Sequence, residues 1–351
     1  MAILESDRPL LDVLQTQIPL VPRPFENIAQ QIGCTEDQVI ERLKALRHPP
    51  APERPVIRQI SAIFDSKSLG YQTTLVAAKI DEARLDEAAA IINKHPGVSH
   101  NYRRNHAFNL WYTLAVPPDS TLGLEKTLAL LHRQSGAVST RMLPTLRLFK
   151  IGVKFDLSGE AAETGAKFGT GFIPATSETP AAICPEARAL IRVLQQDLPL
   201  VREPFALWAD QAGVRVSQLL NKAQDFLDRK LMRRFAAVLK HREAGISANA
   251  MGVWVVPAEK QEAFGRLAAG FAAVSHCYLR SSYADWPYTI FTMVHAQTHE
   301  QCETVLKKIS EESGITEYSA LYSSVEYKKV RVKYFTPEID DWEKSAEAVA
   351  G

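Results

Sequence analysis

Residues 10–25 read LLDVLQTQIPLVPRPF, and residues 190–205 read LIRVLQQDLPLVREPF. Nine of the sixteen aligned positions carry the same amino acid, far more than unrelated segments share. A match of this kind indicates an internal duplication. The chain therefore contains one structural unit twice, as copy one at about residues 10–157 and copy two at about residues 190–335.

The likeness between the copies continues more weakly beyond this segment. Three shorter matches follow: IRQISAIFDSKSLGYQTT (57–74) with MRRFAAVLKHREAGISAN (232–249), VSHNYRR (98–104) with VSHCYLR (274–280), and WYT (111–113) with PYT (287–289). Residues 158–182, between the copies, are rich in Gly, Ala, Ser, Thr and Pro. That composition is typical of a linker.

Each copy opens with short predicted helices. In copy one, PFENIAQQIGC is followed by TEDQVIERLKAL, with Thr35 placed as a helix N-cap and Gly33 in the preceding turn. Apolar residues of the second segment recur at helical spacing, at Val39, Ile40, Leu43 and Leu46. The pattern predicts a helix-turn-helix, which PFALWADQAGV and RVSQLLNKAQDFLDR repeat in copy two.

An α/β segment follows the helices. In copy one it runs from VIRQISAIF (56–64) to VSTRMLPTLRLFKIGVKF (138–155), in the order strand pair, helix, strand pair, helix, strand. This order predicts an α+β fold, a tandem repeat of a helix-turn-helix domain followed by a ferredoxin-like α/β sandwich. Two open sheet faces packed together would make an intramolecular pseudo-dimer. The predicted domains are helix-turn-helix 1 at 1–50, ferredoxin-like domain 1 at 55–157, a linker at 158–182, helix-turn-helix 2 at 183–230, ferredoxin-like domain 2 at 231–335 and a C-terminal tail at 336–351.

Composition narrows the class of protein. The net charge of +1 gives little attraction for a polyanion. No run of about eighteen apolar residues predicts a transmembrane helix. The N-terminal residues lack a signal-peptide pattern, which predicts a cytoplasmic protein. The four cysteines are scattered, so the sequence predicts neither a disulfide framework nor a zinc site.

The helix-turn-helix raises the question of DNA binding. A recognition helix supplies cations to phosphates and polar side chains to base edges. The segment TEDQVIERLKALR offers Arg42, Lys44 and Arg47, but Glu36 and Asp37 stand at its start. Because neither copy makes a basic stripe, the sequence does not favour DNA as a partner and predicts scaffold helices.

The densest group of functional side chains lies in copy two, within KHREAGISANAMGVW (240–254) and SHCYLRSSYADWPYTIFTMVH (275–295). Strand alternation predicts that His276, Tyr278 and Arg280 share one face. A regular strand would likewise align the side chains of Trp286, Tyr288 and Ile290. His295 has the opposite parity to Tyr288, and its direction is left open.

Copy one keeps only part of this group. Its counterparts are His100, Tyr102, Arg104 and Tyr112, whereas the alignment puts Ser66 at the place of His241 and Asp119 at the place of His295. This asymmetry predicts that the chemistry lies mainly in copy two, with copy one completing the pseudo-dimer. A separate pocket in copy one is the alternative.

Ordinary structural roles also explain each residue taken singly, because a strand His, Tyr or Trp is often part of the core. A face that carries His, Tyr and Arg together is costly to bury without a purpose, which favours function for the group. The sequence contains no dinucleotide-binding glycine motif, phosphate-binding loop, HExxH zinc motif or GxSxG nucleophile turn.

A helix-turn-helix joined to a ferredoxin-like domain resembles the Lrp/AsnC regulators, with their AsnC/RAM-type domain. HREAG, SHCYLR and WPYTIFTMVH more closely resemble the siroheme decarboxylases, the Ahb and Nir proteins of that superfamily, over nearly the whole chain. Two copies in one polypeptide resemble the fused NirDL form, with copy one D-like and copy two L-like. The resemblance implies a carboxy-lyase that removes the C12 and C18 acetate carboxyl groups of siroheme as carbon dioxide. The product would be 12,18-didecarboxysiroheme, in heme d1 or alternative heme biosynthesis.

The resemblance also implies roles for particular residues. His276, Tyr278 and His295 are the implied catalytic residues. The implied substrate-binding residues are Arg233, Arg234, His241, Arg242, Asn249, Arg280, Trp286, Tyr288, His100 and Arg104. Either His241 or His295 would ligate the iron of the substrate, since neutral imidazole suits heme iron. No cofactor beyond that iron is implied.

Two other functions stay open from the sequence: a heme-responsive transcription regulator and a heme carrier without turnover. Siroheme and its product are the expected partners, and no membrane partner is expected. A homodimer beyond the pseudo-dimer, the proton donor and the order of the two decarboxylations are left open.

Overall fold

The computed structural model describes residues 7–151, 182–239 and 248–350. The chain divides into two compact units. The first unit contains both helix-turn-helix domains, and the second contains both ferredoxin-like domains. Each unit therefore combines segments from both copies.

Three helices form each helix-turn-helix domain, as the sequence predicts. Their bounds are α1 Arg8–Thr16, α2 Pro24–Ile32 and α3 Glu36–Arg47 in copy one, and α7 Pro185–Leu194, α8 Pro204–Gln211 and α9 Val216–Asp228 in copy two. Thr35 caps α3 in a capping box with Gln38, and Gly33 ends α2 in the left-handed conformation at φ 76°. The predicted cap and turn are thus confirmed.

A two-stranded antiparallel sheet completes the first unit. Strand β1 (Ile57–Phe64) pairs with β7 (Met232–Leu239), and Ile60 lies opposite Ala237. The sequence analysis assigned both strands to the ferredoxin-like domains, and this assignment is wrong. The two strands come from equivalent positions in the two copies, so each meets its repeat counterpart instead of a strand of its own copy.

The second unit contains two five-stranded sheets. Copy one supplies β2 (Gln72–Lys79), β3 (Val98–Arg104), β4 (Leu110–Val116), β5 (Ser139–Leu143) and β6 (Thr145–Ile151), and copy two supplies β8 (Ala248–Trp254), β9 (Val274–Arg280), β10 (Ile290–Ala296), β11 (Tyr318–Leu321) and β12 (Ser323–Lys329). The strand orders are β12-β3-β4-β2-β5 and β11-β8-β10-β9-β6. Apart from one added edge strand, each order is that of a ferredoxin-like sheet, which confirms the predicted fold class.

The added strand of each sheet comes from the other copy. Strand β6 of copy one pairs with β9, and β12 of copy two pairs with β3. The sequence analysis placed each of these strands in its own copy. A lysine fixes each exchanged strand to a helix end of its host: Lys150 Nζ donates to the Phe271 carbonyl at 2.8 Å, and Lys328 Nζ donates to the Asn93 carbonyl at 2.7 Å.

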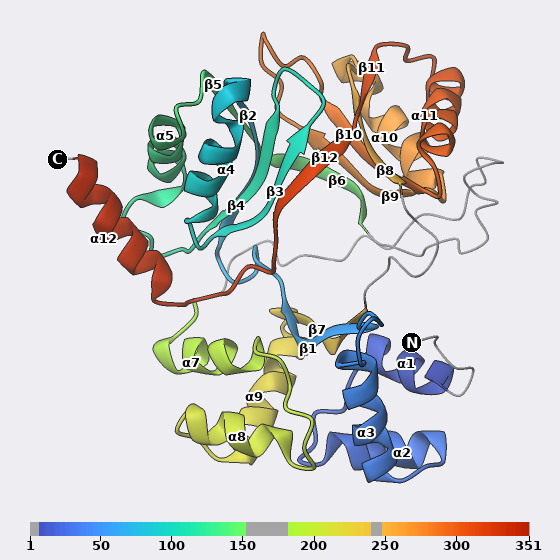
Figure 1. Cartoon of the computed structure of the whole chain (residues 1–351), viewed down its shortest axis with the longest axis vertical. Helices are drawn as coiled ribbons and strands as arrows, with labels where there is room; N and C mark the ends of the chain where they lie inside the picture. Colours follow the sequence, from blue (N-terminus) through green and yellow to red (C-terminus); the bar gives the residue numbers. More distant parts are fainter. Residues whose placement is uncertain (1–6, 152–181, 240–247, 351) are drawn as a thin grey trace. The chain divides into compact units, whose positions relative to one another are not determined.

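Helices cover one face of each sheet, with α4 (Leu85–Asn93) and α5 (Gly123–Ser135) on the first and α10 (Gln261–Gly270) and α11 (His299–Ser313) on the second (Figure 1). Two short 3-10 turns, Glu82–Arg84 and Ala258–Lys260, lead into α4 and α10. The helix-facing sides form two separate apolar cores. A third core joins the opposite faces of the two sheets and contains Ala77, Phe108, Trp111, Leu143, Met251, Val253, Trp286, Phe291 and Leu321. The second unit is thus an intramolecular pseudo-dimer, as expected.

The residues predicted as a C-terminal tail include a helix, α12 (Glu338–Ala350). Trp342 meets the ring of His95 edge-on, with centroids 4.3 Å apart. The buried Glu343 carboxylate accepts hydrogen bonds from the amide of Thr121 at 3.0 Å and from its hydroxyl at 2.7 Å. These contacts dock α12 on copy one. The predicted linker at 158–182 lies outside the described residues, except for Ala182.

Candidate active site

His276, Tyr278 and Arg280 lie on one face of β9, as the sequence predicts. We call these three residues the column. Tyr278 is paired opposite Phe291 and His276 opposite Met293, and both partners line the face that turns away from the helices. The intervening Cys277 is buried in the helix-facing core. Strand alternation therefore predicted the direction of this column correctly.

Arg280 is the C-terminal member of this group on β9. Its guanidinium donates to the Leu143 carbonyl at 2.6 Å and lies over the ring of Tyr278, 4.7 Å from the centroid. Its Nε is buried without a hydrogen-bond partner, and no ion pair with a carboxylate of the described residues involves it. Burial lowers the pKa of Arg280 to about 10, so the group stays charged at neutral pH. A partly buried cation with a buried Nε and no described counter-ion is suited to an anionic ligand.

His276 is the N-terminal member of the group. Its Nδ1 lies 2.7 Å from the Ser275 hydroxyl, and its ring stacks on Tyr278 with centroids 5.9 Å apart. Burial first, and then the charges of Arg280 and Lys150, lower the pKa of His276 to about 4. The imidazole is therefore neutral near pH 7 in the free protein.

His295 and Asn249 form the next row on the same sheet face. They are paired opposite each other on β10 and β8, and His295 follows Met293 by two residues on β10. Residues two apart on a strand share a face, so His295 lies on the side of His276. Asn249 is exposed. The predicted residues His241 and Arg242 lie outside the described residues.

Trp286 and Tyr288 lie in the loop between β9 and β10 and not on a regular strand. Trp286 is fully buried in the core between the sheets, where Tyr288 packs edge-on against it with ring centroids 4.8 Å apart. Ile290 is buried in the opposite, helix-facing core. The predicted alignment of Trp286, Tyr288 and Ile290 on one face is therefore wrong, because β10 begins only at Ile290.

The members of the site in copy two form a continuous series of contacts. Arg280 lies 5.5 Å from the centroid of Phe291, and Phe291 lies 6.2 Å from Trp286, centroid to centroid. Because Arg280 also lies over Tyr278, the column on β9 and the loop with Trp286 and Tyr288 belong to one arrangement.

Copy one repeats the column with His100, Tyr102 and Arg104. Arg104 donates to the Leu321 carbonyl of copy two at 3.0 Å, just as Arg280 donates to Leu143 of copy one. Its Nε is also buried without a partner, and burial lowers the pKa of Arg104 to about 10. The His100 Nδ1 lies 3.0 Å from the Ser99 hydroxyl. The two columns are structurally equivalent.

The strand register corrects two of the predicted equivalences. Trp111 lies opposite Tyr102, and Phe291 lies opposite Tyr278, so Trp111 corresponds to Phe291. Counting on from this pair, Ala115 and not Asp119 occupies the position of His295. Tyr112 is buried in the helix-facing core of copy one and is no counterpart of Tyr288. A longer loop in copy two shifted the sequence alignment.

Arg233 and Arg234 lie on β7, in the first unit, and not among the side chains on β9. Arg233 forms an ion pair with Asp65 at 2.5 Å, and Arg234 donates to the Gln15 carbonyl at 3.1 Å. Backbone and side-chain hydrogen bonds from Ser68 and Arg233 outweigh burial and lower the pKa of Asp65. Both arginines, which the sequence predicted to bind substrate, therefore bind other residues of the first unit.

His106 is a residue of the site region that the sequence analysis missed. It lies in the loop between β3 and β4 of copy one, and its ring meets Trp286 edge-on with centroids 5.2 Å apart. Its Nδ1 accepts a hydrogen bond from the Phe108 amide at 3.0 Å, which leaves the ring proton on Nε2. Burial lowers the pKa of His106. Loop residues have no periodicity, so no pattern in the sequence pointed to it.

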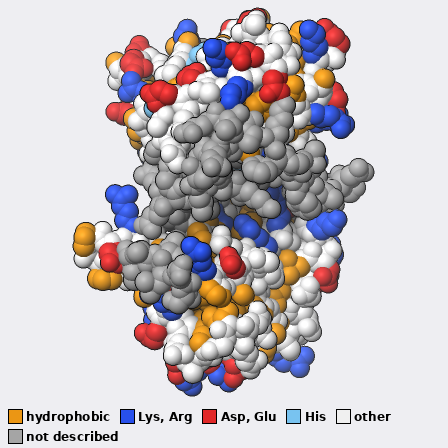
Figure 2. Space-filling model, turned by 90° about the vertical axis from the view of Figure 1, so that its right-hand side faces the viewer, with side chains coloured by type: hydrophobic (Ala, Val, Ile, Leu, Met, Phe, Trp, Pro, Cys, Tyr) orange, Lys and Arg blue, Asp and Glu red, His pale blue; other side chains and the backbone are white. Residues whose placement is uncertain are grey.

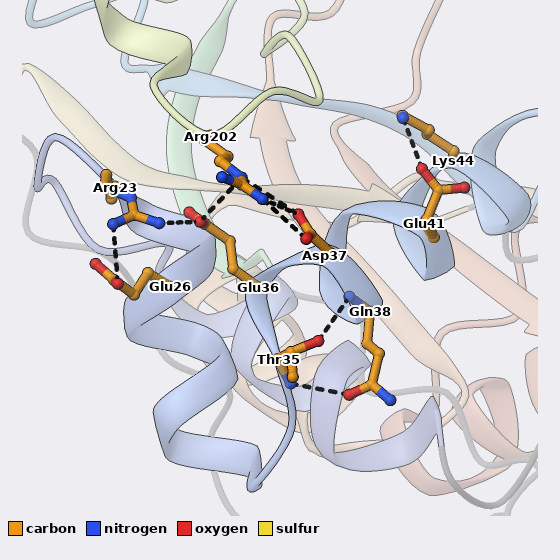
Figure 3. A network of polar contacts seen from close by, with 9 residues as sticks. All are labelled: Arg23, Glu26, Thr35, Glu36, Asp37, Gln38, Glu41, Lys44 and Arg202. Atoms are coloured by element: carbon orange, nitrogen blue, oxygen red, sulfur yellow. Dashed lines mark hydrogen bonds and ion pairs between the residues drawn. The ribbon is translucent and has the colours of Figure 1, made fainter.

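The first turn of α3, the candidate DNA-reading helix, is engaged within the protein (Figure 3). Arg202 of copy two binds Asp37 at 2.9 Å and lies 3.8 Å from Glu36, and Arg23 also pairs with Glu36. On the face shown in Figure 2, the Lys and Arg side chains that are coloured are interspersed with Asp and Glu. Both observations agree with the predicted scaffold role.

Among the described residues, no cluster of three or more His, Cys, Asp or Glu side chains is arranged to hold a metal ion. The described part of the chain also has no helix long and apolar enough to cross a membrane.

Comparison with known proteins first defines the class. The model of the AsnC-like ligand binding domain matches residues 68–150 and 243–328, and the model of the siroheme decarboxylase NirDL-like HTH domain matches residues 7–49 and 187–233. The chain is thus a duplicated AsnC-like protein with two helix-turn-helix domains.

The particular family follows from full-length relatives. A siroheme decarboxylase of Hydrogenobacter thermophilus is 38% identical over 95% of this chain and 96% of its own length. The crystal structure of the siroheme decarboxylase NirDL in complex with an iron-uroporphyrin III analogue is 32% identical, covers 99% of this chain and 100% of that chain, and gives a TM-score of 0.79. The chain belongs to the siroheme decarboxylase family. A beta subunit from Methanosarcina barkeri is 42% identical over 41% of this chain and 95% of its own length, so single copies occur as separate subunits.

Proposed function

We propose that this chain is a siroheme decarboxylase, a carboxy-lyase that removes acetate carboxyl groups of siroheme as carbon dioxide. Full-length similarity to named siroheme decarboxylases carries the proposal. The family membership does not favour a transcription regulator. The proposed reaction centre is the face of copy two that bears Arg280, Tyr278, His276 and His295.

The chemistry of that face suits a substrate rich in carboxylates. Arg280 is a partly buried cation with a buried Nε and no ion-pair partner among the described residues, and a guanidinium binds carboxylate with paired hydrogen bonds. On the same side of the sheet, Met293 is partly exposed and packs against the buried Met251 and Phe291. A macrocycle with a charged rim needs both kinds of contact, and a water-poor wall favours loss of the charged carboxylate.

In the proposed reaction, the bond between the acetate methylene and the carboxylate breaks, and carbon dioxide leaves. The methylene carbon then takes a proton, so each decarboxylation consumes one proton. His276 is our first candidate donor, with Tyr278 and His295 as alternatives. The negative charge of bound carboxylates would offset Arg280 and Lys150 and raise the pKa of His276 from about 4, which would allow its ring to carry that proton.

The finer assignments are also proposals. They comprise loss of the C12 and C18 carboxyl groups, an iron ligand at His241 or His295, and no cofactor beyond the substrate iron. Placement in heme d1 or alternative heme synthesis, a cytoplasmic location and a further homodimer stay predictions of the sequence.

Anaerobic incubation of the full chain with siroheme, followed by mass spectrometry of the tetrapyrrole, tests the proposal. We expect products lighter by the mass of one and then two carbon dioxide molecules. The alternative result is a tetrapyrrole that binds, with a changed Soret band, but is recovered with all its carboxyl groups. That result would indicate a carrier and would contradict the enzyme assignment.

A further inference from the structure

The loops that join the two central strands differ in length between the copies. In copy one, residues 105–109 connect β3 to β4, whereas in copy two residues 281–289 connect β9 to β10. The longer loop carries Trp286 and Tyr288, and the shorter one carries His106. This is the clearest difference between the two otherwise equivalent columns of His, Tyr and Arg.

Strand β5 of copy one holds the longer loop by three contacts. Arg141 forms a bidentate ion pair with Asp285, at 2.8 Å from Nε and 2.7 Å from Nη2. Its guanidinium also lies 5.2 Å from the ring centroid of Tyr283. The Tyr283 hydroxyl donates to the Met142 carbonyl at 2.6 Å.

The anchored residues belong to a tight turn that ends at Trp286. The amide of Tyr283 donates to the Trp286 carbonyl at 2.7 Å, and the amide of Trp286 donates back at 2.9 Å. Trp286 meets Trp111 and Phe108 of copy one with ring centroids 5.1 and 5.5 Å apart. Phe291, which contacts both Trp286 and Arg280, connects this turn to the column on β9.

We propose that Arg141 and Asp285 are positioning residues for the reaction: they hold residues 281–289 against copy one and so shape the wall beside Arg280 in copy two. The inference rests on the proposed function, and it explains why only one of two equivalent columns would work. Neither residue is placed in contact with substrate.

The pair is better suited to positioning than to stabilising the fold. The side chains of Arg141 and Asp285 are 29% and 47% exposed, and ion pairs at such positions contribute little to the free energy of unfolding. A bidentate geometry fixes direction more strongly than a single contact does. The carboxylate remains ionised, because the hydrogen bond from Arg141 lowers the pKa of Asp285.

The test uses the full chain with Asp285→Asn, Arg141→Gln and the exchanged pair Arg141→Asp with Asp285→Arg. We expect kcat for siroheme to fall about tenfold in each single variant, with little change in thermal unfolding, because small misplacements of a reacting group cost rate. Hydrogen exchange of the amides in residues 281–289 should become faster in the single variants. The exchanged pair should recover both kcat and protection.

Arg147→Gln is the matched control. Arg147 pairs with Glu262 at 2.8 Å, also between the two copies, with side chains 51% and 42% exposed, and its partner lies on α10 and not within residues 281–289. It should leave kcat and exchange in the loop at the wild-type values.

Single variants with wild-type kcat and wild-type exchange of residues 281–289 would overturn the inference, as would an exchanged pair that recovers neither. If the wild-type chain releases no carbon dioxide from siroheme, the proposed function fails. The exchange measurement then still decides whether the ion pair holds the loop.

Discussion

Arg104 and Arg280 are the residues that most sharply limit what the site can bind. Arg104 is buried and Arg280 is partly buried, each donates to a backbone carbonyl of the other copy, and each has a buried Nε without a partner. Taking a charge out of water costs free energy unless an opposite charge or good hydrogen bonds compensate. Because the two arginines share this geometry, they make a matched pair for substitution. If their role is structural, replacing either one should have the same effect on activity, whereas a catalytic role predicts unequal effects.

His276 gives a pH-dependent expectation at the same scale. Its pKa is about 4 in the folded chain, below the ordinary value of 6.5, so the unfolded chain binds more protons between these values. The free energy of unfolding should therefore fall as the pH is lowered from about 6.5 to about 4. The stability associated with the neutral His276 should be fully present above about pH 6.5.

Urea unfolding at a series of pH values checks this expectation. His276→Gln keeps a polar side chain and removes the titration, so its stability should fall less steeply in acid than that of the wild type. An unchanged slope in the variant would show that other groups cause the acid sensitivity.

The sequence predicted the site residues unevenly, and the reasons are physical. The direction of His276, Tyr278 and Arg280 followed from strand alternation, which has a fixed period. The positions of Trp286 and Tyr288 did not, because loop residues have no period. His106 was missed for the same reason, and its contact with Trp286 arises only when the two sheets pack together.

At the scale of elements, the exchanged strands β6 and β12 are the least predictable feature. The side-chain pattern of a strand reports which face is buried, but it does not report which sheet contains the strand. The sequence analysis identified residues 138–155 as strand, and the structure places Ser139–Leu143 in one sheet and Thr145–Ile151 in the other, with Pro144 between them. The helix caps, in contrast, depend on neighbouring residues and were predicted at Thr35 and Gly33.

The lysines on the exchanged strands give an expectation for these elements. Lys150→Met and Lys328→Met each remove a hydrogen bond to the carbonyls at a helix end, of α10 and α4 respectively. We expect each to lower the free energy of unfolding by about 1 kcal/mol. Hydrogen exchange should quicken at the C-terminal end of the affected helix and not at the equivalent helix of the other copy.

Denaturant unfolding with peptide-level hydrogen exchange measures both effects. Equal loss of protection at both helices in either variant would contradict this account, because the two contacts are separate.

At the scale of the whole molecule, the copies share strands in three places: β1 with β7, β6 with β9, and β12 with β3. A chain cut within residues 158–182 should therefore yield halves that depend on each other. We expect co-expressed halves, with a tag on one, to co-purify in equal amounts and to retain activity. A relative that occurs as a separate beta subunit supports this expectation.

Each half expressed alone should expose an unpaired sheet edge and aggregate or self-associate. Two stable, monomeric halves that do not associate would contradict the pseudo-dimer. The repeat in the sequence was enough to predict the fusion of two copies. The mutual dependence of the copies could be predicted only once the strand pairing was known.

The most direct test of the central claim, a reaction centre in copy two of an unequal pseudo-dimer, compares Arg280→Met with Arg104→Met. The measurement is kcat/KM for anaerobic decarboxylation of siroheme, with thermal unfolding recorded for both variants. We expect similar losses of stability, because the two arginines make equivalent contacts, and a fall in kcat/KM of roughly 10- to 100-fold in Arg280→Met alone. Equal falls in both variants, or a larger fall in Arg104→Met, would contradict the assignment to copy two.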